Sequence, residues 1–271
     1  MKKLIISTLT FLVVFIVIVL CIPAPISPAA FLPAESPKLT GVLTPNNLLQ
    51  NAELLGLGKI HGPEEVAVDR LGNVFAGTQD GKIIKVTADS KLEVFANTFG
   101  RPLGMQFDQQ HNLIVADAYK GLLSIAPTGK ITVLATTANG VPFKFTDALD
   151  IANDGMIYFT DASDTFQQDE YLYDLLEAKP HGRLLSYDPA TKQVKVLLRD
   201  LYFANGVALS TQQDFVLVNE TYRYRIIRYW LKGPKAGSHD IFIDNLPGFP
   251  DNISSNGKGT FWLAMFTIRN N

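Results

Sequence analysis

The stretches EEVAVDRLGNVFAGT (residues 64–78) and LGMQFDQQHNLIVAD (residues 103–117) share one pattern, an apolar alternating run, a turn and a second apolar run. The pattern returns in DALDIANDGMIYFTD from residue 147, NGVALSTQQDFVLVN from 205 and DNISSNGKGTFWLAM from 251, so the successive spacings are 39, 44, 58 and 46 residues. Segments between the copies, such as GKIIKVTADSKLEVFA, are typical of further strands joined by short polar turns. Short strands that repeat at about 40–45 residues predict an all-β fold of the β-propeller type.

The copies indicate four complete blades and the inner part of a fifth. A propeller closes to protect its edge strands, and an open blade exposes unpaired N–H and C=O groups. We therefore expect a blade to be missing from the sequence through a truncated gene, a fragment or a frameshift. The alternative is a natural five-bladed propeller that is closed by residues 46–60.

The first 45 residues differ from the repeats. Lys2 and Lys3 are followed by residues 4–22 without a charged side chain, which is long enough to span a bilayer as a helix. The two lysines favour a cytoplasmic N-terminus and an exported body. We predict a transmembrane anchor or signal at 1–23, a Pro-rich linker at 24–45 and an incomplete propeller at 46–271. The protein is then a single-pass membrane protein, or a secreted one if the segment is a cleaved signal.

The charge balance argues against a nucleic-acid-binding protein, and the cysteine content argues against a disulfide-stabilised fold. The chain has 24 Lys and Arg against 26 Asp and Glu, a formal net charge of -2, so it lacks the basic excess that nucleic-acid binding requires. We expect no nucleic-acid partner. Cys21 is the only cysteine, so no intrachain disulfide can form.

Five equivalent positions just ahead of the first strand of each blade are the candidate site. They are occupied by Glu64, Leu103, Asp147, Asn205 and Asp251. The innermost strands of a propeller line its axis, so we expect three carboxylates and an amide to share one small space, with Asn252 next to them. Like charges at such distances need compensation. An all-oxygen set fits a hard cation such as Ca²⁺ better than Zn²⁺; alternatively, these residues serve only as turn residues before strands.

Longer motifs carry a family resemblance. The stretches LLEAKPHGRLLSYDPATKQVKVLLRDLYFANGVALS, IIRYWLKGPKAG and NLPGFPDNISSNGKGTFWLAM closely resemble the strictosidine-synthase-like and adipocyte plasma-membrane-associated protein-like family, from about residue 45 onward. The resemblance implies a six-bladed β-propeller, of which about four and a half blades are present and the sixth is missing. It also implies the axial Ca²⁺ of the wider superfamily, which includes gluconolactonases, squid-type phosphotriesterases and paraoxonases.

The resemblance assigns roles to individual residues. It matches the superfamily's calcium ligands to Glu64, Asn205 and Asp251, with Asp147 where asparagine is usual, and it places the histidine of paraoxonases at Leu103, where no histidine exists. The expected metal set is Glu64, Asp147, Asn205, Asp251 and Asn252. Asp251 is the expected catalytic residue, acting as general base or nucleophile at the metal's edge.

Residues 164–180 lengthen the third repeat, and their middle, 168–178, is expected to form a short helix. Insertions on a rigid scaffold often carry specificity. We therefore expect Leu103, Tyr171 and His181 to contact substrate; the alternative for the insertion is a surface decoration without a role.

Three functions follow from these observations. The first is a Ca²⁺-dependent hydrolase that acts on a small lactone or aryl ester. The second is a non-catalytic, membrane-tethered binding propeller in which calcium only stabilises the fold. A strictosidine synthase-type condensation of an amine with an aldehyde is less favoured, because that reaction uses a glutamate of the last blade, which this sequence does not contain.

Overall fold

The computed structural model describes residues 2–269, and its strands confirm the predicted propeller. Blade 1 comprises β1 (Val66–Val68), β2 (Val74–Gly77), β3 (Lys82–Val86) and β4 (Leu92–Asn97). Blade 2 comprises β5 (Pro102–Phe107), β6 (Leu113–Asp117), β7 (Gly121–Ile125) and β8 (Ile131–Ala135). Blade 3 comprises β11 (Thr146–Ile151), β12 (Ile157–Asp161), β13 (Gly182–Asp188) and β14 (Gln193–Leu201). Blade 4 comprises β15 (Ala204–Leu209), β16 (Phe215–Glu220), β17 (Arg225–Trp230) and β18 (His239–Ile243). Blade 5 has β19 (Gly248–Ser255) and β20 (Phe261–Ile268).

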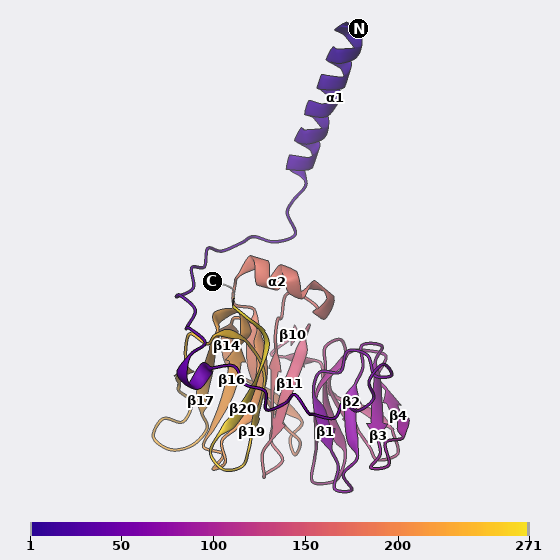
Figure 1. The fold of residues 1–271 in the computed structure, drawn as a ribbon, viewed down its shortest axis with the longest axis vertical. Helices are drawn as coiled ribbons and strands as arrows, with labels where there is room; N and C mark the ends of the chain where they lie inside the picture. The colour runs from indigo at the N-terminus through magenta and orange to yellow at the C-terminus, as the bar shows by residue number, and fades with distance from the viewer. Residues whose placement is uncertain (1, 270–271) are drawn as a thin grey trace.

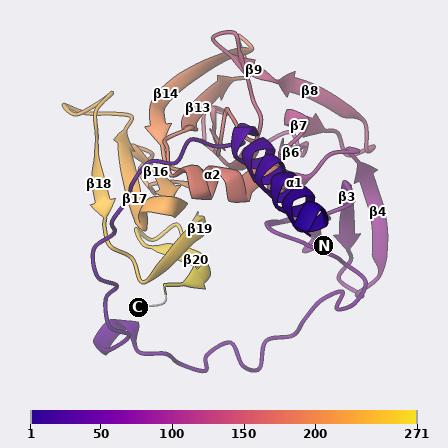
Figure 2. The ribbon, with the colours of Figure 1, turned by 90° about the horizontal axis from the view of Figure 1, so that it is seen from above.

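Each sheet is antiparallel and follows the order of the chain. The sheets stand around a common axis in Figure 2, and the first strand of each blade contacts the first strand of the next. A small hairpin of β9 (Thr137–Ala138) and β10 (Val141–Pro142) precedes blade 3. Residues 46–60 contain turns but no strand, and they cross the side between blades 5 and 1 (Figure 2). The alternative of a five-bladed ring closed by this segment is therefore wrong.

The turn between the first two strands of every blade uses the same backbone device. One residue has a positive φ at the same register position in all five blades, namely Gly72, His111, Gly155, Gln213 and Gly259. In blade 1 the Asp69 carboxylate accepts the N–H groups of Leu71 and Asn73, both at 2.9 Å. A side-chain acceptor of this kind satisfies the backbone N–H groups of its own turn, so the turn is stable without contacts from other segments.

The core consists of apolar layers between successive blades. Phe75 and Ile83 of blade 1 pack with Val115 and Leu123 of blade 2. Equivalent clusters join blades 2 and 3, blades 3 and 4, and blades 4 and 5. Blades 2, 3 and 4 therefore bury both of their faces against neighbours, whereas blades 1 and 5 each bury one face.

Three buried carboxylates lie at the ends of the second strands, and we call Asp117, Asp161 and Glu220 the outer carboxylates. Their registers are equivalent, because they pair with Pro102, Thr146 and Ala204 of the first strands. Each accepts a backbone N–H from the loop before its own inner strand. The donors are Arg101, Phe145 and Tyr202, each at 2.9 Å.

The N-terminal helix α1 (Lys2–Cys21) is apolar after its two lysines and has no buried residue. Its length and composition suffice to cross a membrane, although a signal sequence has the same properties. The single turn η1 (Gly41–Leu43) follows it. Figure 1 shows α1 projecting beyond the end of the propeller that carries α2.

The Pro-rich segment is more than the extended spacer that the sequence suggests, because part of it lies on the propeller. The Ala29 N–H donates to the Glu177 carbonyl at 2.8 Å, and the Asn245 side chain donates to the Glu35 carbonyl at 2.9 Å. The Phe31 ring lies 3.8 Å from the Arg223 guanidinium. Cation–π and hydrogen-bond contacts of this kind hold proline-rich chain that has no regular structure of its own.

The insertion of blade 3 forms the expected helix. A short turn η2 (Gln168–Glu170) leads into α2 (Tyr171–Glu177) between β12 and β13. Ala178 ends the helix in the left-handed conformation, with a φ of 55°. Another short turn, η3 (Thr221–Arg223), lies between β16 and β17. Strand order places α2 and η3 at the same end of the propeller as the loops that lead into the inner strands.

Candidate active site at the propeller axis

Strand register confirms that the five repeat positions are equivalent. The last pairs between first and second strands join Val68 to Val74, Phe107 to Leu113, Ile151 to Ile157, Leu209 to Val216 and Ser255 to Phe261. Counting back four residues from the first member of each pair gives Glu64, Leu103, Asp147, Asn205 and Asp251. We call Glu64, Asp147, Asn205, Asp251 and Asn252 the axial set, because they lead into or begin the innermost strands.

Direct contacts join the axial residues of blades 4 and 5. The Asn205 amide nitrogen donates to Oδ1 of Asp251 at 2.8 Å. The Asn219 amide nitrogen donates to the Asp251 carbonyl at 2.5 Å, and the Thr160 hydroxyl donates to the Asn205 carbonyl at 2.8 Å. Thr160 and Asn219 precede two of the outer carboxylates by one residue. The second strands of blades 3 and 4 thus hold the inner strands of blades 4 and 5.

Several buried oxygens at this level have no hydrogen-bond partner. They are Oδ1 of Asp147, Asn205, Asn219 and Asn252. Most buried polar side-chain atoms in proteins are paired, and leaving one unpaired costs about 1–3 kcal/mol. Unpaired oxygens from three successive blades therefore suggest a ligand that is itself a donor or a cation.

The raised pKa values of the axial carboxylates also favour a bound cation. Burial raises the pKa of Asp147 well above its usual range, and the charges of Glu64 and Asp251 raise it further. Loss of water around the Glu64 carboxylate raises its pKa to about 7, with Asp251 adding to the effect, even though the residue keeps accessible surface. Burial likewise raises the pKa of Asp251. These groups give up their protons reluctantly unless a positive charge joins them.

Carboxylates alone do not complete a metal site at the axis. Among residues 2–269, no group of three His, Cys, Asp or Glu side chains is arranged to hold a metal ion. Asp251 binds the Asn205 amide directly, while Glu64, Asp147 and Asp251 act on one another through their charges. A cation at this level would depend on amide oxygens of Asn205 and Asn252 as much as on carboxylates. Such an all-oxygen donor set suits Ca²⁺.

An apolar wall rises above the axial set. Leu103, Phe145, Phe203 and Tyr222 form one buried cluster, against which Leu175 of α2 packs. The Phe203 and Tyr222 rings stack with centroids 4.5 Å apart. Leu103 therefore puts apolar surface at the ring position where the other blades carry polar side chains. A contact of Leu103 with substrate stays a prediction.

Tyr222 is a site residue that the repeats did not reveal. Its hydroxyl donates to the Tyr171 carbonyl at 3.1 Å. Burial raises its pKa strongly, and the charges of Asp174, Asp147 and Asp251 contribute. Tyr222 therefore lies between α2 and the axial set. Tyr222 belongs to η3, which is not part of the repeat. In the sequence, only its position two residues after Glu220 could have indicated that it lies near the axis.

Tyr171 and His181, the other two expected substrate contacts, lie in different surroundings. The side chain of Tyr171 is exposed on α2, and its carbonyl binds Tyr222. His181 bonds to the Glu177 carboxylate at 2.7 Å and to the Thr165 hydroxyl at 3.1 Å, so its ring is held at the base of the insertion. No hydrogen bond joins it to the described axial residues. A role for His181 at the substrate remains a prediction.

Glu65 is a second residue that sequence reasoning did not select. It lines a cavity of about 570 Å³ that follows the axis below the axial set, together with Gln106 and Asp150. Burial raises the pKa of Glu65 to about 8, and the charges of Glu64 and Asp150 raise it as well. The Met105 N–H donates to its carboxylate at 3.2 Å.

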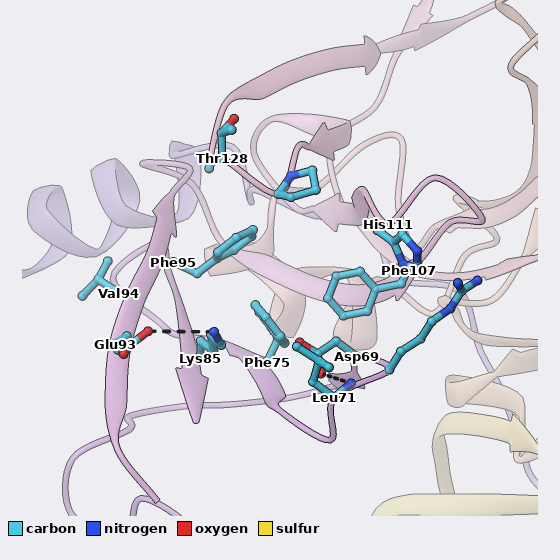
Figure 3. A pocket seen from close by; sticks show the side chains of 13 residues that line it. Asp69, Leu71, Phe75, Lys85, Glu93, Val94, Phe95, Phe107, His111 and Thr128 are labelled. Carbon is cyan, nitrogen blue, oxygen red and sulfur yellow. Dashed lines mark hydrogen bonds and ion pairs between the residues drawn. The ribbon is translucent and has the colours of Figure 1, made fainter. Parts of the chain in front are cut away.

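A separate cavity of about 710 Å³ lies away from the axis, at the outer side of blades 1 and 2 (Figure 3). Phe75, Phe95 and Phe107 form its apolar floor. Lys85 pairs with Glu93 at 3.9 Å, and the Asp69 carboxylate accepts the Asn73 amide at 2.7 Å. The larger cavity therefore offers paired charges, whereas the axis offers unpaired oxygens, and we place the candidate site at the axis.

Solved structures of other proteins share this propeller fold. A gluconolactonase from Xanthomonas campestris superposes with a TM-score of 0.64 at 18% identity, covering 76% of this chain and 70% of that chain. A calcium-binding protein, regucalcin, from Agrobacterium tumefaciens superposes with a TM-score of 0.60 at 15% identity, covering 76% and 68%. At these identities the likeness concerns the fold alone.

Sequence comparison gives the family. Residues 147–234 match strictosidine synthase, and residues 41–86 match the N-terminal part of strictosidine synthase-like proteins. Protein strictosidine synthase-like 6 of Arabidopsis thaliana is 46% identical over 80% of this chain and 60% of its own length. Adipocyte plasma membrane-associated protein of Rattus norvegicus is 41% identical over 92% of this chain and 70% of its own length. The chain belongs to the strictosidine synthase-like family and spans about 60–70% of the length of these curated relatives.

Proposed function

We propose that this propeller is a Ca²⁺-dependent hydrolase of small lactones or aryl esters, and that α1 ties it to a membrane with its body on the exported side. The observation that carries the hydrolase is the group of buried, unpaired oxygens of Asp147, Asn205 and Asn252, which stand at one level of three blades. The gluconolactonase-type fold supports the same reaction class by analogy only.

The axial set would hold the ion. Glu64, Asp147 and Asp251 supply carboxylate oxygens, and Asn205 and Asn252 supply neutral amide oxygens, so the donors are of the kind that Ca²⁺ prefers. When bound, Ca²⁺ supplies Lewis-acid polarisation of a carbonyl group. The remaining chemistry falls to side chains of the chain.

Asp251 is the proposed base. It keeps partial exposure, and the Asn205 amide fixes its Oδ1. Its carboxylate would take a proton from water while the water oxygen bonds to the carbonyl carbon of the substrate. The single bond between the carbonyl carbon and the ester oxygen then breaks, and the leaving oxygen takes the proton from Asp251. An ester yields a carboxylic acid and an alcohol, and a lactone yields a single hydroxy acid. Such proton transfer typically contributes about 10²–10⁴-fold to the rate.

The apolar wall would receive the rest of the substrate. Leu103, Phe145 and Phe203 offer a surface without hydrogen-bonding groups beside the axial set. Tyr171 and His181 stand on the insertion that carries α2, from where they would contact the outer part of the substrate. Specificity for an aryl or alkyl group would therefore depend on this wall and on α2.

A non-catalytic binding propeller is the second candidate. Oxygens that come from three blades could serve an ion whose only effect is to hold those blades together, and the contact of Asn205 with Asp251 already links blades 4 and 5. The two candidates agree on the ion and differ on turnover.

One pair of measurements tests both. The full chain, purified in detergent and freed of metal with EDTA, is titrated with CaCl₂ by calorimetry and assayed with phenyl acetate and δ-valerolactone. The hydrolase requires calcium binding and turnover that EDTA abolishes. Binding with a higher melting temperature and no turnover would favour the binding propeller. No heat of binding at millimolar Ca²⁺ would remove the axial ion from both.

A further inference from the structure

The helix α2 buries both of its acidic side chains and exposes most of its apolar ones. Leu172, Tyr173 and Leu176 are 52%, 41% and 60% exposed, whereas Asp174 is 0% and Glu177 7% exposed. A surface helix in water normally turns its apolar stripe inward and its charges outward. Three apolar side chains on one outward face of a seven-residue helix therefore call for an apolar partner.

Contacts on the inner side prevent α2 from rolling to hide these side chains. The Glu177 carboxylate accepts the Ser27 N–H at 2.8 Å through one oxygen and bonds to His181 at 2.7 Å through the other. The Tyr222 hydroxyl binds the Tyr171 carbonyl at 3.1 Å. Breaking these bonds to bury Leu172 and Leu176 would leave the Glu177 carboxylate without partners, so the outward face is fixed by the fold.

The same contacts set the distance between α2 and the apolar helix α1. The chain leaves α1 at Cys21 and is bound at Ser27 and Ala29 to Glu177, the last residue of α2. An extended chain advances about 3.3–3.6 Å per residue, so the six steps from Cys21 to Ser27 reach about 20 Å at most. Figure 1 shows both helices beyond the same end of the propeller.

The rim around α2 carries tyrosines. Tyr171 and Tyr173 are exposed on the helix, and the exposed Tyr119 of the neighbouring blade bonds to the Gln168 side chain at 3.1 Å. Tyrosine is enriched where protein meets the headgroup region of a bilayer, because its ring is apolar and its hydroxyl is polar. A soluble protein partner would not explain why the chain binds the end of an apolar helix to this same rim.

We propose that the outward face of α2, formed by Leu172, Tyr173 and Leu176, lies in the interfacial layer of the bilayer that holds α1, so that the mouth of the axial channel faces the membrane surface. This inference rests on the proposed membrane anchor and is independent of the hydrolase reaction. The apolar face is small, so it would orient the propeller while α1 provides most of the attachment.

The test places one fluorophore at a time in the full chain, reconstituted into phosphatidylcholine vesicles that contain spin-labelled lipid as the quencher. Leu172→Cys and Leu176→Cys are made in a Cys21→Ser background, so that each chain has one thiol. Gln110→Cys, in an exposed turn at the opposite end of the propeller, is the matched control. Labelling Cys21 of the unaltered chain reports on the anchor itself, because Cys21 ends α1.

The expected result is several-fold stronger quenching at positions 21, 172 and 176 than at position 110. Quenching at 21 with none at 172 and 176 would overturn the docking of α2 and leave the anchor intact. No quenching at 21 would overturn the anchor and the docking together. A blue-shifted but unquenched label at 172 would show that protein, such as a second copy of the chain, covers this face, and that outcome also overturns the proposal.

Discussion

Two rings of polar side chains repeat around this propeller, and they differ in what their oxygens bind. The outer carboxylates Asp117, Asp161 and Glu220 bind the loops before their inner strands, and the last two also pair with Arg183 and Arg225. Within this outer ring, one oxygen of Asp117 has no partner. In the axial set, Asp147, Asn205 and Asn252 each leave an oxygen without a partner. Repetition and burial alone therefore do not identify a functional residue; unpaired oxygens that gather from neighbouring blades distinguish the candidate site from the scaffold.

The outer carboxylates hold the loops before the inner strands through one or two backbone N–H groups. Asp161 accepts the N–H of Phe145 at 2.9 Å and that of Lys144 at 3.2 Å, while Glu220 accepts that of Tyr202 at 2.9 Å. Aspartate and glutamate therefore serve the same structural purpose in this ring.

The largest expected effect comes from exchanging one carboxylate of each ring for the isosteric amide. Asp161→Asn breaks the buried pair with Arg183 and should lower the free energy of unfolding by about 3–5 kcal/mol. Asp147→Asn in metal-free protein should cost nothing or stabilise, because it removes a charge that its neighbours oppose. Denaturant unfolding in EDTA measures both, and equal losses in the two variants would erase the distinction between the rings.

Asp251→Asn should next separate ion binding from catalysis. An amide oxygen can still bind the ion but cannot act as the base, so we expect hydrolysis to fall by at least about a hundredfold with moderately weaker calcium binding. Glu64→Ala should instead reduce calcium binding and hydrolysis together. The readouts are kcat/KM and calorimetric titration. Unchanged turnover in Asp251→Asn would remove this residue from the mechanism.

The pH dependence of stability should differ with and without calcium. The pKa values of Glu64 and Glu65 rise to about 7 and about 8 on folding, so the folded state holds more protons than the unfolded state between about pH 4.5 and 8. Stability in EDTA should therefore be highest below this range and fall as the pH rises through it, by a few degrees in Tm. Calcium should restore Tm at pH 8 and change it little at pH 5. A Tm in EDTA that rises over this range would contradict the assignment.

The smallest effects should come from the wall. Tyr222→Phe loses the bond to the Tyr171 carbonyl and should cost about 1 kcal/mol of stability. Tyr171→Ala keeps that carbonyl, so it should alter KM or substrate preference with a change in stability below about 0.5 kcal/mol. Thermal melts and KM values for two esters of different size distinguish the variants. A lowered Tm with unchanged kinetics in Tyr171→Ala would make α2 purely structural.

The sequence predicted the propeller because its first two strands and their turn recur at spacings that survive even the long insertion of blade 3. It also predicted which five positions are equivalent, and the strand pairs confirm them. It did not reveal Tyr222, the binding of the Pro-rich segment or the pairing of the outer carboxylates. Those features depend on contacts between segments that are distant or unrepeated in the sequence, such as Ser27 with Glu177, and they leave no periodic trace in the chain.

The sequence does not determine how closely the axial carboxylates gather. Equivalent positions on different blades point to one axis, but the distance between them depends on how far the strands stand from it. This distance follows from the packing of whole blades.

Two glycines beside the axial set fix the spacing of the inner strands, while the residues just before them determine the chemistry of the ring. A Cβ on Gly206 would lie 2.4 Å from the Asp251 carbonyl oxygen, and one on Gly104 would lie 2.7 Å from the Asp147 carbonyl oxygen. No other residue fits there without moving an inner strand. The preceding positions, 103 and 205, carry leucine and asparagine, which have very different chemistry. A lineage can therefore exchange the residue that meets the ligand in a single mutational step, while the adjacent glycine keeps the geometry beyond the reach of such steps.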